Sequence, residues 1–152
     1  KNNIYRKKGK VTKYKVFISM DFYIRKNSTE PVIKMKVIED GKNDYGNLHD
    51  KLANSSIKFS MRDYNTGVYK ILNRSGSIVS LTNVDVNAPT EYYIFYRFRE
   101  QDTNTAGRYQ GEFSIYFNDD CAELIVPIRD NLFININDSF ARSNCANCVD
   151  NT

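Results

Sequence analysis

The sequence of 152 residues has no tryptophan and little proline, cysteine or histidine: it contains 3 Pro, 3 Cys and 1 His. It also has no run of about 18 consecutive apolar residues, so we expect neither a transmembrane helix nor membrane insertion. No apolar signal-peptide segment stands near its start. Because the first residue is Lys1 rather than Met, we expect a fragment or a processed form.

The few cysteines argue against a disulfide framework. Their number is odd, and Cys145 and Cys148 are clustered near the end of the sequence, which is more typical of a chain kept reduced in a cytoplasm. A structural zinc site needs four ligands. Only Cys121 and His49 remain to complete one, each in a separate turn or loop, so we expect no metal ion.

The sequence also lacks a recognisable catalytic arrangement. His49 lies in a polar loop near Asp44 and Asp50, without the nucleophile and positioned base that covalent catalysis needs. Neither a Gly-x-Ser-x-Gly elbow nor a His-Glu-x-x-His helix is present. Asp119 and Asp120 have no calcium-loop spacing around them. We therefore expect a protein that is not an enzyme and has no cofactor.

Aromatic residues are abundant, with 11 Tyr and 9 Phe, and many lie in alternating patterns. In residues 108–117, apolar residues and Gly111 alternate with polar ones, which predicts a strand with one buried face. The aromatic run 92–98 precedes it, and the polar turn 102–107 separates the two, so we predict a β-hairpin. The buried core is predicted to include Phe59, Met61, Ile94, Tyr109, Phe113, Ile115 and Phe117.

The whole chain follows the same rhythm of short strands and turns. Turn residues recur every eight to twelve positions, as in an all-β sandwich, and the length suits one domain. Residues 73–76, Asn-Arg-Ser-Gly, predict a turn, and Pro127 is expected to end a strand. The predicted strands are 13–24, 31–38, 57–61, 68–72, 78–81, 92–98, 108–117, 122–126 and 132–136.

Several of these segments together resemble a known family. The order is a β-rich approach ending near Phe98, the turn 102–107, the alternating strand that follows, and an exit containing Pro127; upstream, residues 56–63 add a strand ending in Arg-Asp. This order is similar to the small immunoglobulin-like domain at the N-terminus of baseplate upper proteins and in other virion proteins of tailed phages. The resemblance covers residues 22–138, although Lys26-Asn27-Ser28-Thr29 replaces the family's usual Gly-Asp-Thr.

The resemblance implies an all-β, immunoglobulin-like sandwich of about seven to nine antiparallel strands, without catalysis. It also implies a structural component of a tailed-phage virion, assembled in the host cytoplasm. Such a component joins or decorates other virion proteins in the capsid, neck, baseplate or fibre attachment. The implied partners are these virion proteins, or further copies of the chain in a symmetric oligomer.

Positive charge is concentrated at the start of the chain. Residues 1–26 hold nine basic residues and one acidic residue, a net charge of +8, whereas the remainder holds 13 basic and 17 acidic residues, a net charge of −4. We therefore expect a basic arm with a first strand (1–24), a sandwich (25–138) and a polar tail (139–152). The arm is predicted to dock onto another subunit through Arg6, Lys7, Lys8, Lys10, Lys13, Tyr14, Lys15, Val16, Ile18 and Met20.

Three alternatives stay open. The first strand pairs within the chain's own sandwich and leaves only residues 1–10 outside it. Alternatively, the basic arm binds nucleic acid, with lysines on phosphates and aromatic residues stacking on bases. A third alternative is a receptor- or carbohydrate-binding module that uses the loops at one end of the sandwich. The polar loop 39–55 is a further expected contact element.

Overall fold

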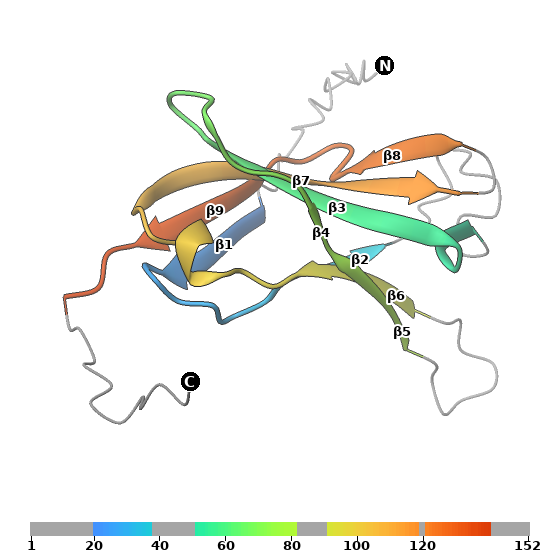
Figure 1. Cartoon of the computed structure of the whole chain (residues 1–152), viewed down its shortest axis with the longest axis horizontal. Coiled ribbons are helices and arrows are strands. Elements are labelled where there is room, and N and C mark those ends of the chain that lie inside the picture. Colours follow the sequence, from blue (N-terminus) through green and yellow to red (C-terminus); the bar gives the residue numbers. More distant parts are fainter. Residues whose placement is uncertain (1–19, 38–50, 82–90, 119–120, 141–152) are drawn as a thin grey trace, which may run out of the picture.

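The computed structural model describes residues 20–37, 51–81, 91–118 and 121–140. These residues form a six-stranded sheet, in the order β1-β9-β7-β3-β4 with β8 also paired to β7, and a three-stranded sheet, β2-β6-β5 (Figure 1). The expected all-β class is confirmed, and two sheets around one core are compatible with a sandwich. The elements are β1 (Met20–Arg25), β2 (Ile33–Val37), β3 (Ser55–Asp63), β4 (Tyr69–Ser75), β5 (Ser77–Leu81), β6 (Glu91–Tyr96), the 3-10 helix η1 (Glu100–Asp102), β7 (Gly107–Phe117), β8 (Ala122–Val126) and β9 (Leu132–Asn137).

Strand β7 is the centre of the larger sheet. Strand β3 pairs with it antiparallel along one side. Two shorter strands share the other side, β8 beside Phe113–Phe117 and β9 beside Gly107–Gly111. Pro127 follows β8 directly, and because proline has no N–H for a strand ladder, β8 ends there as predicted.

The alternation predicted for β7 is confirmed by burial. Its odd-numbered positions from Tyr109 to Phe117 are buried, while Arg108, Glu112 and Tyr116 on the other face are exposed. Ser114 is the exception, because it is buried on the otherwise polar face. All seven predicted core residues are buried: Phe59, Met61, Ile94, Tyr109, Phe113, Ile115 and Phe117.

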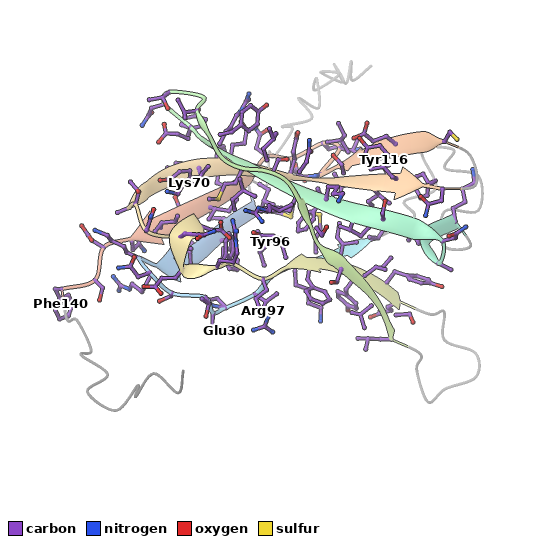
Figure 2. The ribbon with its side chains drawn as sticks, in the orientation of Figure 1. Glu30, Lys70, Tyr96, Arg97, Tyr116 and Phe140 are labelled. Atoms are coloured by element: carbon purple, nitrogen blue, oxygen red, sulfur yellow. The ribbon has the colours of Figure 1, made fainter. Side chains whose placement is uncertain are left out.

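Aromatic rings join the two sheets at the middle of this core. The Phe59 ring of β3 stacks on the Tyr96 ring of β6, with 4.7 Å between centroids, and lies 4.8 Å from Phe113. Phe98 meets both Phe59 and Tyr96 edge-on. Figure 2 shows Tyr96 between the two sheets. Such ring pairs stabilise by about 0.5–1.5 kcal/mol beyond the area that they bury.

The predicted hairpin between residues 92–98 and 108–117 is wrong. Strand β6 pairs with β2 and β5 in the smaller sheet, whereas β7 belongs to the larger one. The connection between them is an arch, residues 97–106, that contains η1. Phe98, Asp102 and Thr103 of this arch are almost fully buried. The arch therefore crosses between the sheets instead of making a solvated turn.

The predicted turn at residues 73–76 is also wrong. Strand β4 continues to Ser75 and β5 begins at Ser77, so one edge ribbon (residues 69–81) leaves the larger sheet and enters the smaller (Figure 1). A Cβ at Gly76 would lie 2.8 Å from the carbonyl oxygen of Phe95 and 3.1 Å from the Ile57 side chain. Glycine permits this close approach of the two sheets.

Strand β1 lies across the predicted boundary between the basic arm and the sandwich, which was placed after residue 24. It pairs in parallel with β9, from Met20 beside Leu132 to Arg25 beside Asn137. Ile24 is buried, and Met20 and Phe22 pack against the core. For residues 20–24 the docking prediction is therefore wrong, because a strand with one apolar face completes the chain's own sheet more simply.

Candidate functional site on the larger sheet

Most of the predicted contact residues lie outside the residues that the structure describes. This holds for nine of the ten docking residues, for His49, Cys145 and Cys148, and for residues 39–50 of the expected contact loop. Leu52, at the end of that loop, is fully buried, and Cys121 is exposed. Within the described ranges, no group of three or more His, Cys, Asp or Glu side chains is placed to hold a metal ion.

The outer face of the larger sheet carries a cluster of rings and charges across β1, β9 and β7. The Arg108 guanidinium lies 4.0 Å from the ring centroid of Phe133 and 3.5 Å from the Asp21 carboxylate. Tyr64, in the turn after β3, meets the Phe133 ring edge-on at 5.4 Å. Asn135 donates a hydrogen bond to Asp21. This cluster covers Phe133 and pairs the charges of Arg108 and Asp21.

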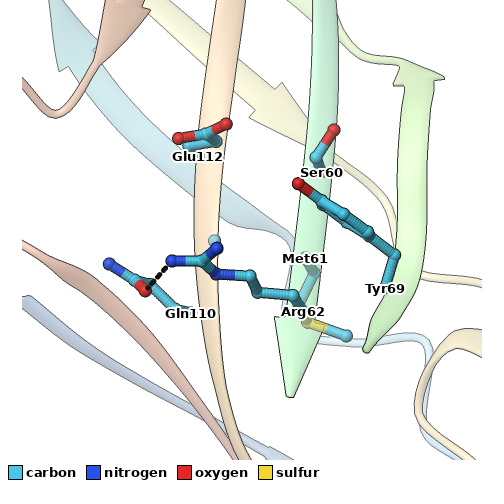
Figure 3. A pocket seen from close by; sticks show the side chains of 7 residues that line it. Ser60, Met61, Arg62, Tyr69, Gln110 and Glu112 are labelled. Atoms are coloured by element: carbon cyan, nitrogen blue, oxygen red, sulfur yellow. Dashed lines mark hydrogen bonds between the residues drawn. The ribbon is translucent and has the colours of Figure 1, made fainter. Parts of the chain in front are cut away.

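Next to this cluster, a hollow opens over β3, β4 and β7. Figure 3 shows Arg62 and Gln110 on one side of it, Glu112 and Ser60 on another, and Tyr69 reaching across from β4. The Arg62 guanidinium donates to the Gln110 carbonyl oxygen (3.2 Å), and the Gln110 amide donates to Asn131 (3.1 Å). The hollow is lined by Ser60, Met61, Arg62, Tyr69, Gln110, Gly111 and Glu112.

A local irregularity of the β3–β4 pair accounts for this hollow. The register shifts on both sides of Met61, and Asn73 on β4 has a positive φ of 50°. Ser60 stabilises the irregularity, because its hydroxyl accepts a hydrogen bond from the Asn73 backbone N–H (2.9 Å). Bulges of this kind turn side chains away from a regular ladder. Beyond the irregularity Arg62 lies opposite Tyr69, and both side chains line the hollow.

Two polar groups in the hollow have no partner within the described chain. Neither the Glu112 carboxylate nor the Tyr69 hydroxyl makes a hydrogen bond there, and Tyr69 is 54 % exposed. Arg62 uses one of its donors on Gln110. The hollow therefore offers an acceptor, several donors and an aromatic ring, without a nucleophile paired to a base.

A second polar cluster lies inside the arch, where Asp102 is 1 % exposed. Its carboxylate accepts hydrogen bonds from the Tyr96 hydroxyl (2.7 Å) and from the backbone N–H and side chain of Arg99 (2.9 and 2.7 Å). The Thr103 hydroxyl donates to the Ser28 carbonyl oxygen (2.8 Å). The bonds to Asp102 hold the arch together and tie it to Tyr96 of β6, and the Thr103 bond ties it to the β1–β2 connection, so the cluster has a structural role.

The same bonds determine how the cluster titrates. Burial alone would raise the pKa of Asp102, but the hydrogen bonds from Arg99 and Tyr96 outweigh burial and lower that pKa. Burial, followed by the hydrogen bond to Asp102, raises the pKa of Tyr96 to about 12. The folded chain therefore keeps Asp102 ionised and Tyr96 neutral over the whole physiological range.

The outer face of the smaller sheet carries an exposed charge network. Lys36 on β2 donates to Glu91 on β6, and the Tyr93 hydroxyl donates to the other carboxylate oxygen (2.8 Å). The Lys34 ammonium lies 4.2 Å from the Tyr93 ring centroid. The hydrogen bond from Lys36 lowers the pKa of Glu91 and raises that of Lys36.

Comparisons with protein-family models, with curated proteins and with solved structures returned no match to this chain. No helix in the described part of the chain is long and apolar enough to cross a membrane.

Proposed function

We propose that this chain is a non-enzymatic structural component of a tailed-phage virion. It joins or decorates other virion proteins, or copies of itself, through protein–protein contacts. The resemblance of residues 22–138 to the immunoglobulin-like domains of baseplate upper proteins motivates this proposal. The immunoglobulin-like form of the sandwich is part of it, and the two sheets around one core are compatible with that form.

The exposed apolar side chains of the edge ribbon support the proposal most. Four large apolar or aromatic side chains of this one ribbon are exposed, by 38–59 %: Tyr69, Leu72, Val79 and Leu81. Exposed apolar groups that gather on one element mark contact surfaces more often than isolated ones do. Aromatic stacking joins the two sheets, so the sandwich is also suited to act as a rigid body between neighbouring virion proteins.

The test is detection of the chain in particles of the phage or induced prophage that encodes it. Virions purified on a density gradient are digested, and peptides of this chain are quantified by mass spectrometry against the major capsid protein. We expect a fixed copy number per particle, which resists a high-salt wash. If peptides of the chain are found in the infected-cell lysate but not in the gradient-purified particles, the proposal is wrong.

A second candidate function is recognition of a saccharide at the hollow on the larger sheet. Glu112 and the Tyr69 hydroxyl have no partner within the described chain, and the exposed Tyr69 ring offers a face for the C–H side of a sugar. A glycan array probed with the full chain tests this candidate. Glu112→Gln and Tyr69→Ala should each remove binding. The control is Tyr116→Ala, which changes an exposed tyrosine on the same face of β7 as Glu112 and should retain binding.

Nucleic-acid binding by the basic arm stays a prediction, because Lys7, Lys8, Lys10, Lys13 and Lys15 lie outside the described residues. Its test is the dependence of DNA binding on salt, since each phosphate contact releases counterions.

A further inference from the structure

Sheet edges differ in how they are protected against further pairing. Within the described ranges, five strands pair on one side only: β1, β2, β4, β5 and β8. Four of them carry charged residues, such as Asp21 on β1, Lys34 on β2, Lys70 on β4 and Glu123 on β8. Strand β5, with the sequence Ser-Ile-Val-Ser-Leu, has neither charge nor proline. Charges, proline and bulges are the usual means by which proteins prevent edge-to-edge pairing.

The contrast is sharpest within the edge ribbon itself. Its β4 half carries Lys70, Arg74, the positive φ of Asn73 and two shifts of register against β3. Its β5 half pairs with β6 in regular register over all five residues. Among the described residues, the ribbon is thus protected along β4 and has no charge, proline or shift of register along β5.

We propose that β5 pairs antiparallel with β5 of a second copy of this chain, about a two-fold axis at Val79. The two smaller sheets then become one six-stranded sheet in the order β2-β6-β5-β5-β6-β2. In this register each Val79 lies opposite its symmetry mate, and Ser77 lies opposite Leu81. A two-fold contact uses the same patch on both copies.

Two observations identify the second copy as the occupant. Because β5 carries no charge, placing it against itself brings no like charges together. The same centred pairing of β2 would place Lys34 opposite Lys36, and that of β4 would place Lys70 opposite Arg74. Val79 lies beside Tyr93 on the outer face of the smaller sheet. Pairing at Val79 therefore creates a continuous apolar row of two valines between two tyrosines, which buries the exposed part of Val79 (38 %).

The contact is small, since it consists of five residues from each copy. Interfaces of less than about 1,200 Å² are typical of weak or transient association. We therefore expect a dimer that depends on concentration in solution and becomes stable where many copies are held together. This inference rests on the proposed function for its biological meaning, because it names one of the partners in the assembly.

Sedimentation velocity of the full chain from low to high micromolar concentration tests the pairing. We expect the weight-average mass to rise towards twice that of the monomer. Val79→Lys should stay monomeric at every concentration, because the axis would bring two ammonium groups together. Leu72→Lys, which adds the same charge to the protected half of the ribbon, should still dimerise. Matching melting temperatures of both variants exclude unfolding as the cause.

A charge-swap experiment then tests the register. Val79→Lys and Val79→Glu should each be monomeric alone, and an equimolar mixture should form heterodimers, because only the two-fold register places position 79 opposite itself. A monomeric wild type, a dimeric Val79→Lys or a monomeric mixture would each overturn the inference. None of these results changes whether the chain is found in purified virions, so the two proposals fail separately.

Discussion

The two sheets share one core but contribute to it unequally. In the larger sheet β3, β7 and β9 have partners on both sides, whereas in the smaller sheet only β6 does among the described strands. The fully buried strand residues follow the same division, since the larger sheet supplies Phe59, Met61, Phe113, Ile115 and Ile134 and the smaller sheet supplies Ile94. We therefore expect the larger sheet to carry most of the stability. Among the described edge strands, β5 of the smaller sheet is the one without a charged residue.

The largest expected effect comes from emptying the core on the side of the larger sheet. Phe113→Ala should lower the free energy of unfolding by about 3–5 kcal/mol, because the ring is fully buried and leaves a cavity. Met35→Ala in the smaller sheet should cost about 1–2 kcal/mol, because its side chain is only partly buried. Urea unfolding of both variants measures the difference. Equal costs would contradict the unequal division between the sheets.

The arch that joins the sheets should respond next. Asp102→Asn should cost about 1.5–3 kcal/mol, because the variant loses charge-assisted hydrogen bonds and leaves buried donors poorly paired. Glu100→Gln in the same 3-10 helix is the control, and we expect its midpoint of unfolding to match the wild type. A loss of equal size in both variants would show that the stability depends on η1 as a whole and not on the buried Asp102 carboxylate.

The pH dependence of the same pair separates charge from packing. Because the pKa of Asp102 is lowered on folding, its contribution is present above the ordinary aspartate pKa of about 4 and is lost as pH falls through the lower folded value. The pKa of Tyr96 is raised to about 12, so its contribution is lost as pH rises from the ordinary value of about 10 towards 12. Thermal melts from pH 2 to 7 should show a flatter acid limb for Asp102→Asn.

A smaller effect is expected where the edge ribbon passes between the sheets. Gly76→Ala should cost about 1–2 kcal/mol, because the new methyl group would lie 2.8 Å from the carbonyl oxygen of Phe95. Ser77→Ala, one residue further along the exposed start of β5, should leave the midpoint unchanged. Differential scanning calorimetry of the pair checks this. A stable Gly76→Ala would mean that the two sheets can separate locally without cost.

The smallest effect is expected on the outer face of the smaller sheet. Glu91→Gln removes the partner of Lys36, but exposed ion pairs contribute little and are screened by salt. We expect a melting temperature within error of the wild type at 0.15 M salt. A clear loss of stability there would indicate that this network supports the sheet.

Period-two patterns predicted the strands and the core residues well. In β7, alternation is sufficient, because a strand with one apolar face has one way to bury it. The same patterns did not predict which sheet each strand joins. Asp102 and Thr103 resemble turn residues, and only the partners Tyr96, Arg99 and Ser28, distant in part along the sequence, explain their burial. Likewise, Gly76 predicts a turn from the sequence alone, and only its close approach to the Phe95 carbonyl oxygen explains why glycine is needed there.

The candidate site was less predictable than the core. Gln110 and Glu112 were expected on the solvent face of β7, and they are there. The hollow, however, depends on the shifts of register around Met61, beyond which Arg62 pairs with Tyr69 and both line the hollow. A sequence signal for this bulge is weak, because Ser60 and Asn73 are common in turns and acquire their role only when paired.

The pairing of β1 with β9 sets an order of events during synthesis. Among the described strands β1 has no other partner, and its residues pair with positions more than 110 residues later in the chain. At about 5–20 residues per second, a ribosome needs roughly 6–22 s to proceed from Arg25 to Asn137. For that time the apolar face of β1 lacks the pairing with β9, so folding of the larger sheet is expected to finish only after β9 has left the ribosome.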